Sequence, residues 1–256
     1  MYDLETRQHV LALVSQGRSL NAVSKQTGIS RWAIRSWQTR IEPLARTSVC
    51  SLCGPSPQPP QDTTAYAYLL GLYLGDGCVS RQSSGSYTLR IACADAWPGL
   101  IDACREAIKR VRPTNSVCLV QNPGCVSVAS ASKHWPCLFP QHGSGKKHER
   151  RITLERWQQW IVDTHPWEFL RGLIHSDGCR ITNWTTRLVG GERKRYEYPR
   201  YFFTNKSDDI RKLFTDTLDK VGVEWKMTRR GNGTVDVSVA RRASVALMDV
   251  HIGPKY

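Results

Sequence analysis

An internal repeat in the last three quarters of the chain constrains its fold more than any other feature. Residues 69–77 (LLGLYLGDG) are matched by residues 170–178 (LRGLIHSDG), and a cysteine follows both copies. The second copy lies 101 residues after the first, which is far longer than the period of a solenoid repeat. The repeat therefore predicts two similar subdomains in one chain.

The two halves share further landmarks in the same order. Residues 126–129 match residues 237–240, and Gly-Lys-Lys at 145–147 is matched by Gly-Pro-Lys at 253–255. Between these landmarks each half has an alternating run typical of a strand, followed by an amphipathic helix. Each half is therefore expected to run helix, two strands, helix, two strands and a connecting segment. The alternating runs are residues 87–93 and 198–203, and the amphipathic helices are residues 97–111 and 208–223.

Small residues lie on one face of the helix that each repeat copy predicts. Gly71 and Gly75 are four residues apart, as are Gly172 and Ser176, and residues at this spacing share a helix face. Small side chains on that face allow two helix backbones to approach closely. These four residues are therefore expected to form the interface between the subdomains.

Each of these two helices ends in Asp-Gly, at Asp76 and Asp177. If the helices pack side by side, their C-terminal ends bring the two carboxylates together. Such a pair repels itself unless a divalent cation lies between the acids, and hard oxygen ligands suit Mg²⁺. One Asp-Gly alone is typical of a turn or helix cap. Two copies with matching small-residue faces favour a metal-binding pair.

The two copies resemble the motif of LAGLIDADG homing endonucleases, with its glycine, the following leucine and the closing Asp-Gly. The sixth motif position, usually acidic, is Leu74 in one copy and His175 in the other. The resemblance implies an α+β fold over residues 63–256. Two pseudo-symmetric αββαββα subdomains, residues 63–160 and 161–256, would form a DNA-binding saddle.

The resemblance also implies an active site for hydrolysis of phosphodiester bonds in duplex DNA, with water as the nucleophile. Asp76 and Asp177 would hold catalytic Mg²⁺ or Mn²⁺, helped by the backbone carbonyls of Gly75 and Ser176. Each half of the site would cut one DNA strand, so that the enzyme makes double-strand breaks in a long target.

Members of that family often carry a basic residue late in each half, near the scissile phosphates, where it helps to position water. Lys147 and Lys255 occupy matching late positions after a glycine. The resemblance therefore assigns this role to them, with His148 or Lys146 as a substitute for Lys147. A solvated surface lysine is the alternative interpretation of each.

Residues 1–42 are expected to form a small all-α domain. Gly28 marks a tight turn between a helix at residues 20–27 and a helix that starts at Ser30. The pattern resembles a helix-turn-helix, in which the last helix enters the major groove. A three-helix bundle with a charged surface is the alternative. The expected DNA contacts are Arg31, Trp32, Arg35 and Ser36.

Residues 43–62 are typical of a semi-extended linker between the two parts. Cys50 and Cys53 lie in this segment as a C-x-x-C pair. Two such pairs are the usual zinc signal, and the sequence holds no second pair. Zinc at Cys50 and Cys53 is therefore not expected. The linker prolines are Pro43, Pro55, Pro57, Pro59 and Pro60.

The charge of the chain favours a polyanionic partner. With 36 Lys and Arg against 22 Asp and Glu, the formal charge is +14, and nucleic acid is the commonest partner for such an excess. Basic residues in the predicted strands fit a DNA-binding sheet. They are Arg90 in the first half, and Arg187, Arg193, Arg195, Lys226, Arg229 and Arg230 in the second.

Other bulk features bear on location and assembly. The sequence has no long apolar run for a membrane-spanning helix, and its N-terminus is not that of a signal peptide. Nine scattered cysteines favour free thiols in a reducing compartment. We expect a cytoplasmic monomer with internal pseudo-two-fold symmetry, associated with the nucleoid if bacterial, neither secreted nor bound to membranes.

Two alternatives to the nuclease stay open at this point. Some transcriptional regulators join a helix-turn-helix to a LAGLIDADG-like domain that has lost its acids, and the presence of both Asp76 and Asp177 argues against that interpretation. Other members of the family are RNA maturases that assist intron splicing. No feature of the sequence separates a maturase from the endonuclease.

Overall fold

The computed structural model describes residues 2–42, 50, 53, 58–230 and 234–256. The chain divides into two compact units, Met1–Ser48 and Val49–Tyr256. Of the predicted linker prolines, Pro43, Pro55 and Pro57 lie outside the described residues. No helix in the described part of the chain has the length and apolar character needed to cross a lipid bilayer.

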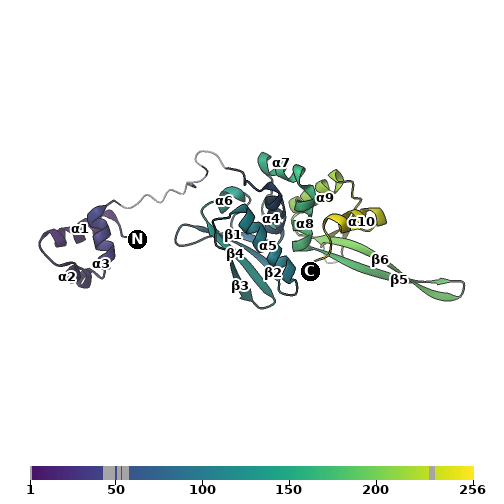
Figure 1. The fold of residues 1–256 in the computed structure, drawn as a ribbon, viewed down its shortest axis with the longest axis horizontal. Coiled ribbons are helices and arrows are strands. Elements are labelled where there is room, and N and C mark those ends of the chain that lie inside the picture. Colours follow the sequence, from purple (N-terminus) through teal and green to yellow (C-terminus); the bar gives the residue numbers. More distant parts are fainter. Residues whose placement is uncertain (1, 43–49, 51–52, 54–57, 231–233) are drawn as a thin grey trace. The chain divides into compact units, whose positions relative to one another are not determined.

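The smaller unit contains three short helices (Figure 1). They are α1 (Leu4–Ser15), α2 (Leu20–Thr27) and α3 (Arg31–Thr39), and Asp3, Ser19 and Ser30 cap their N-termini through side-chain oxygens. Gly28 ends α2 with a left-handed backbone at φ 70°, which a residue without Cβ adopts readily. Six buried apolar side chains form the core: Val10, Leu13, Val23, Ile29, Ile34 and Trp37.

The larger unit consists of two halves with the same order of elements, so the predicted αββαββα repeat is confirmed. Both four-stranded sheets are antiparallel, with strand orders β1-β2-β4-β3 and β5-β6-β8-β7. The first half contains α4 (Thr63–Asp76), β1 (Gly77–Arg81), β2 (Tyr87–Ala94), α5 (Pro98–Val111), β3 (Cys118–Asn122), β4 (Cys125–Ser132) and α6 (Trp135–Leu138). The second contains α8 (Pro166–Asp177), β5 (Gly178–Val189), β6 (Glu192–Thr204), α9 (Asp208–Lys220), β7 (Lys226–Arg229), β8 (Val235–Val239) and α10 (Arg242–His251). A 3-10 turn, η1 (Lys147–Glu149), and α7 (Arg156–Thr164) connect the halves.

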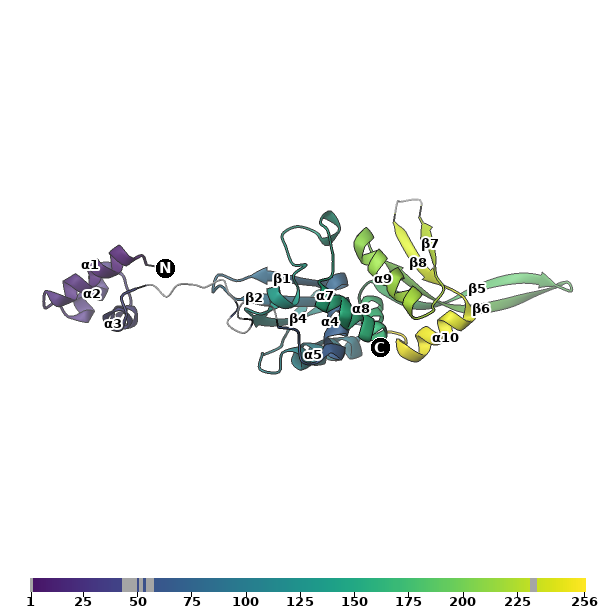
Figure 2. The same ribbon diagram turned by 90° about the horizontal axis from the view of Figure 1, so that it is seen from above.

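Helices α4 and α8 lie side by side between the two sheets (Figures 1 and 2). Every residue of α4 from Ala65 to Leu74 is buried. A helix that is apolar on all sides requires partners on all sides, and α4 packs against α5, α7, α8 and the first sheet. The repeated motif therefore forms the centre of the larger unit.

The two halves differ most in their first hairpins. Strands β5 and β6 have 12 and 13 residues, whereas β1 and β2 have 5 and 8. The outer part of the β5–β6 hairpin extends well beyond the rest of its sheet (Figure 2). The prediction of a strand at 198–203 caught only the inner end of β6, because the outer residues are exposed on both faces and show no apolar alternation.

One predicted helix boundary was wrong. The helix expected to reach residue 223 ends at Lys220, and Val221 caps it. Asp62, the last residue of the predicted linker, accepts a hydrogen bond from Ala65 N at 2.8 Å and pairs with Arg110 at 2.7 Å. This residue therefore belongs to the folded unit as the N-cap of α4.

Candidate metal centre at the ends of α4 and α8

The backbones of α4 and α8 touch at Gly71 and Gly172. A Cβ atom at Gly71 would lie 2.5 Å from the carbonyl oxygen of Phe169, and one at Gly172 would lie 2.2 Å from that of Tyr68. Any larger residue would force the helices apart, because both obstacles are backbone atoms. Contact between the two helix backbones therefore requires glycine at both Gly71 and Gly172.

One turn further on, the helices meet through Gly75 and Ser176. A Cβ at Gly75 would lie 2.1 Å from Ser176 Oγ. This hydroxyl donates within its own helix, towards the carbonyl oxygens of Gly172 and Leu173, both 3.0 Å away. The four residues expected at the subdomain interface are thus brought together, with glycine on one helix making room for serine on the other.

The close approach of the helices brings Asp76 and Asp177 near each other at their C-terminal ends. Burial, and then repulsion from Asp76, raises the pKa of Asp177 to about 6. Partial desolvation raises the pKa of Asp76, opposed by the charges of Lys255 and Lys147. Asp177 is half-buried, while Asp76 reaches the surface. The pair therefore carries an unfavourable concentration of negative charge.

The ammonium group of Lys147 lies over the last turn of α4. Its Nζ donates to the carbonyl oxygens of Tyr73, Leu74 and Gly75 at 2.5, 2.9 and 2.7 Å. A cation is favourable at a helix C-terminus, where carbonyl groups lack partners in the helix. Burial lowers the pKa of Lys147 to about 8, although Asp177 and Asp76 oppose the shift.

Lys255 repeats this arrangement at α8, where its Nζ donates to the carbonyl oxygen of Ser176 at 2.9 Å. Burial lowers its pKa, against the charges of Asp76, Cys179, Asp177 and Cys93. The substitutes considered for Lys147, Lys146 and His148, pair with Glu149 at 3.6 and 3.9 Å. Both still line the cavities beside the aspartates, Lys146 that of Asp76 and His148 that of Asp177.

Two cavities meet at this cluster. One of ≈ 390 Å³ is lined by Asp177, Asn205 and Lys206 together with Gly75 and Lys147. Another of ≈ 260 Å³ contains Asp76 and is also lined by Gly75 and Lys147. Each carboxylate therefore lines its own cavity, and Lys147 lines both.

Two polar residues of this region were given no role by the sequence analysis. Asn205, directly after β6, donates from Nδ2 to Asp177 Oδ2 at 2.5 Å and so orients that carboxylate. His175, at the variable motif position, is buried with Nδ1 2.9 Å from Tyr68 Oη. Burial lowers the pKa of His175 to about 4, so the imidazole is neutral. The sequence signal for Asn205 was weak, because an asparagine after a strand is typical of an ordinary turn.

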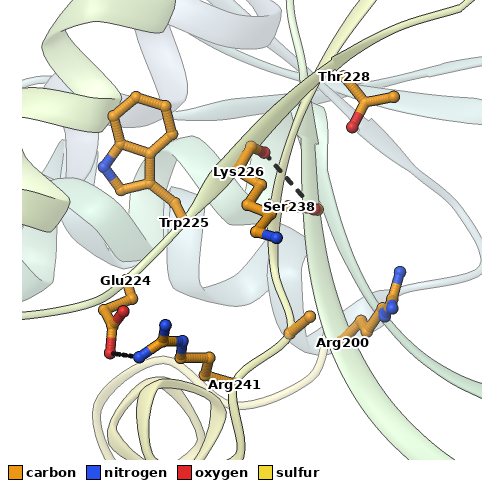
Figure 3. Close-up of a pocket in the computed structure, with 8 residues that line it drawn as sticks. Arg200, Glu224, Trp225, Lys226, Thr228, Ser238 and Arg241 are labelled. Atoms are coloured by element: carbon orange, nitrogen blue, oxygen red, sulfur yellow. Dashed lines mark hydrogen bonds and ion pairs between the residues drawn. The ribbon is translucent and has the colours of Figure 1, made fainter.

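The outer face of the second sheet carries a basic pocket of ≈ 370 Å³ (Figure 3). Alternation along β6 and β8 directs Tyr201 and Val239 into the core, so that Arg200 and Ser238 face outwards. Lys226 on β7 lies beside Ser238 on β8. Glu224 pairs with Arg241 at 2.6 Å across one end of the pocket. Arg200 was not among the predicted contacts.

The predicted basic residues of the β5–β6 hairpin lie on both of its faces. Arg193 and Arg195 lie opposite Leu188 and Thr186, whereas Arg187 lies opposite Lys194. Because side chains alternate along a strand, Arg187 is on the other face of the hairpin from Arg193 and Arg195.

The other predicted contacts are placed as follows. Arg90 Nη1 donates to Ser80 Oγ at 2.6 Å, on the first sheet. Lys226 lines the outward-facing pocket of the second sheet, while Arg230 pairs with Asp236. In the smaller unit α3 buries Ile34 and Trp37 and exposes its opposite side. The exposed residues of that side include Arg31, Trp32, Arg35 and Ser36. In the larger unit, Arg229 is exposed on β7.

The expectation that Cys50 and Cys53 have no partner pair was wrong. His134 and Cys137, at the start of α6, lie beside them, and the four ligand atoms are all within 4.8 Å of one another. The second pair was missed because it is a His-x-x-Cys more than 80 residues away in the sequence.

No protein-family profile and no curated protein matches this sequence. Solved structures do match its fold. I-DmoI in complex with DNA and Ca has a TM-score of 0.49 at 17% identity, covering 74% of this chain and 89% of that chain. The I-LtrWI LAGLIDADG homing endonuclease bound to target DNA has a TM-score of 0.49 at 11% identity, covering 74% and 84%. The N-terminal LAGLIDADG domain of DUF199/WhiA has a TM-score of 0.45 at 11% identity, covering 80% and 87%.

The fold is similar to that of LAGLIDADG proteins. At these identities the matches concern the fold alone.

Proposed function

We propose that this protein hydrolyses phosphodiester bonds in duplex DNA at the Asp76–Asp177 pair. The observation that carries the proposal is the duplicated cluster itself. Two helices in direct backbone contact each end in an aspartate, and each end is capped by a lysine from the same late position of its half. A purely structural helix pair does not require two carboxylates that repel each other.

The residues of this cluster fit a divalent cation such as Mg²⁺ or Mn²⁺. The carboxylates of Asp76 and Asp177 and the carbonyl oxygens of Gly75 and Ser176 are the hard oxygen ligands that these ions prefer. Each carbonyl oxygen has two lone pairs, so the contact with a lysine leaves one available. When bound, such a cation would polarise the phosphate and make water more acidic.

The two lysines supply positive charge close to where a phosphate would lie. With its pKa lowered to about 8, Lys147 exchanges protons near neutral pH more readily than a solvated lysine does. It is therefore suited to hold or accept a proton from an attacking water. Asn205 would keep the Asp177 carboxylate oriented through its 2.5 Å hydrogen bond.

We assign DNA binding to the outer faces of the sheets, where Arg90, Arg200 and Lys226 are presented. The +14 charge of the chain favours such a partner. In the smaller unit the exposed side of α3 is suited to a major groove. Because the two units are joined in one chain, contacts by α3 would raise the effective affinity of the larger unit.

A cleavage selection tests this function. The full chain is incubated with Mg²⁺ and a random duplex library, and the ends of the products are sequenced. We expect double-strand breaks at a preferred site, lost in Asp76→Asn and in Asp177→Asn. Asp102→Asn, an exposed acid on α5, is the matched control and should cut normally. Tight, selective binding of duplex DNA without cleavage would instead indicate a regulator, and selective binding of intron RNA would indicate a maturase.

A further inference from the structure

A second group of ligand-type side chains lies away from the aspartate pair. Cys50 Sγ and Cys53 Sγ are 3.3 and 3.1 Å from His134 Nδ1, and Cys137 completes the group within 4.8 Å. We propose that Cys50, Cys53, His134 and Cys137 bind one structural zinc ion.

The geometry of the group suits a tetrahedral ion. Tetrahedral Zn–S bonds of about 2.3 Å and Zn–N bonds of about 2.0 Å place a sulfur and a nitrogen ligand roughly 3.5 Å apart and two sulfur ligands roughly 3.8 Å apart. The sulfur–nitrogen distances of 3.3 and 3.1 Å need to widen by only a few tenths of an ångström. Three thiolates and one imidazole are a ligand set typical of structural zinc.

Three of the four ligands are buried, and Cys137 is partly exposed. The exposed fractions of Cys50, Cys53 and His134 are 6%, 7% and 4%. A zinc ion held by four protein ligands has no open position for water or substrate, which is the property that separates structural from catalytic zinc. The site therefore stabilises structure and takes no part in hydrolysis.

Local backbone structure presents each pair of ligands together. Cys53 N donates to the carbonyl oxygen of Cys50 at 3.2 Å, and Cys137 N to that of His134 at 3.0 Å. The second pair is held firmly, because His134 N donates to Ser132 Oγ at 3.1 Å and Trp135 Nε1 to the carbonyl of Ser130 at 2.9 Å.

A positive charge acts on one ligand of the group, His134. Zinc with three thiolates carries a net charge of −1, which a nearby cation would stabilise. Burial, and then the charge of Arg112, lowers the pKa of His134. The Nε of Arg112 is buried and has no hydrogen-bond partner among the residues that the structure describes.

The repeated fold does not itself require these cysteines. The second half has no cysteine after Cys179, yet its strands and helices follow the same order. The site is therefore an addition to the first half. It would fasten the segment that contains Cys50 and Cys53 to the corner between β4 and α6.

Metal analysis of the full chain tests the proposal. Protein purified under reducing conditions should contain about one zinc ion per chain. The count should be the same in an Asp76→Asn/Asp177→Asn variant, so the result is independent of the proposed nuclease. Replacement by Co²⁺ should give the intense visible absorption of a tetrahedral thiolate site.

Single substitutions locate the ion. Cys50→Ser and Cys137→Ser should lose the zinc and the cobalt spectrum, while Cys118→Ser, an exposed thiol on β3, should keep both. If Cys137→Ser does not fold, Cys53→Ser tests the same ion outside the repeated fold. Absence of zinc from the reduced wild-type protein, zinc retained in Cys50→Ser and Cys53→Ser, or a Cys50–Cys53 disulfide shown by thiol titration would overturn the proposal.

Discussion

Lys147 donates a hydrogen bond from Nζ to the carbonyl oxygen of Gly75 at 2.7 Å, directly before Asp76. The other half of the molecule repeats this relationship with Lys255 and the carbonyl of Ser176. A glycine with positive φ precedes each lysine, Gly145 at 76° and Gly253 at 71°. The duplication therefore extends to the turn that returns each lysine to its helix.

The first prediction concerns this lysine. Lys147→Met should reduce the rate of DNA cleavage about 100-fold or more, because it removes the cation and proton acceptor beside the carboxylates. Binding of the DNA should change far less. Single-turnover cleavage and a separate binding assay measure the two effects. Lys146→Met, which removes an exposed neighbour, should leave both within about two-fold; equal losses in the two variants would refute a role specific to Lys147.

The second prediction concerns the helix contact. Gly71→Ala should lower the free energy of unfolding by about 3 kcal/mol, because the new methyl group meets backbone atoms that have no room to shift. Gly75→Ala should cost less, since its obstacle is the Ser176 side chain. Urea denaturation measures both. Adding Ser176→Gly should rescue Gly75→Ala and leave Gly71→Ala unchanged, and rescue of neither would show that the packing is not specific.

Cation binding should depend on pH through Asp177. Below its raised pKa of about 6 the carboxyl group is protonated and must lose that proton to bind a cation. We expect Mn²⁺ affinity to rise by up to about ten-fold per pH unit up to pH 6 and to level off above it. Calorimetric titration at several pH values measures this. A flat profile in the wild type, or the same slope in Asp177→Asn, would contradict the assignment.

In mild acid His175 should contribute a loss of stability to the larger unit, against a gain from Asp177, whose pKa is raised to about 6. Its folded pKa is about 4, whereas an unfolded histidine has a pKa of about 6.5. Between these values only the unfolded chain takes up the proton, so stability is lost as the pH falls through this window, by at most about 1.4 kcal/mol per pH unit. Urea denaturation at several pH values should show a smaller slope for His175→Gln. The more exposed His148→Gln should keep the wild-type slope.

The smaller unit should contribute to DNA binding through α3. Arg31→Ala/Arg35→Ala should weaken binding of the full chain and reduce the slope of log affinity against log salt by about 0.9 for each phosphate that the variant no longer neutralises. Binding measured over a range of salt concentrations checks this. Lys25→Ala, an exposed residue of α2, is the control. An unchanged salt slope in the double variant would exclude α3 from the interface.

The repeat made the central features predictable. Asp76, Asp177, Lys147 and Lys255 were identified because each has a counterpart at the same place in the other half. The glycines of the interface were identified because their spacing fits a single helix face. The repeat and the four-residue spacing can both be found in the sequence without knowledge of the three-dimensional structure.

Features present in only one half were not predictable in this way. Asn205 reaches Asp177 from a turn, and His134 meets Cys53 only after the first sheet has formed. The faces of the exposed hairpin were not predictable either. The pairing of β5 with β6 places Arg187 and Arg195 on opposite faces, and the sequence of a hairpin that is exposed on both faces does not specify that pairing.

The unequal first hairpins have a consequence for symmetry. At about 3.3 Å per residue, the 12 residues of β5 span roughly 40 Å, against less than half of that for the 5 residues of β1. Although the cluster of aspartates and lysines is nearly two-fold symmetric, the first hairpins of the sheets on its two sides are not. A nucleic acid bound across both sheets would be contacted over a longer stretch by the second sheet than by the first. Its recognition sequence should therefore be asymmetric and not palindromic.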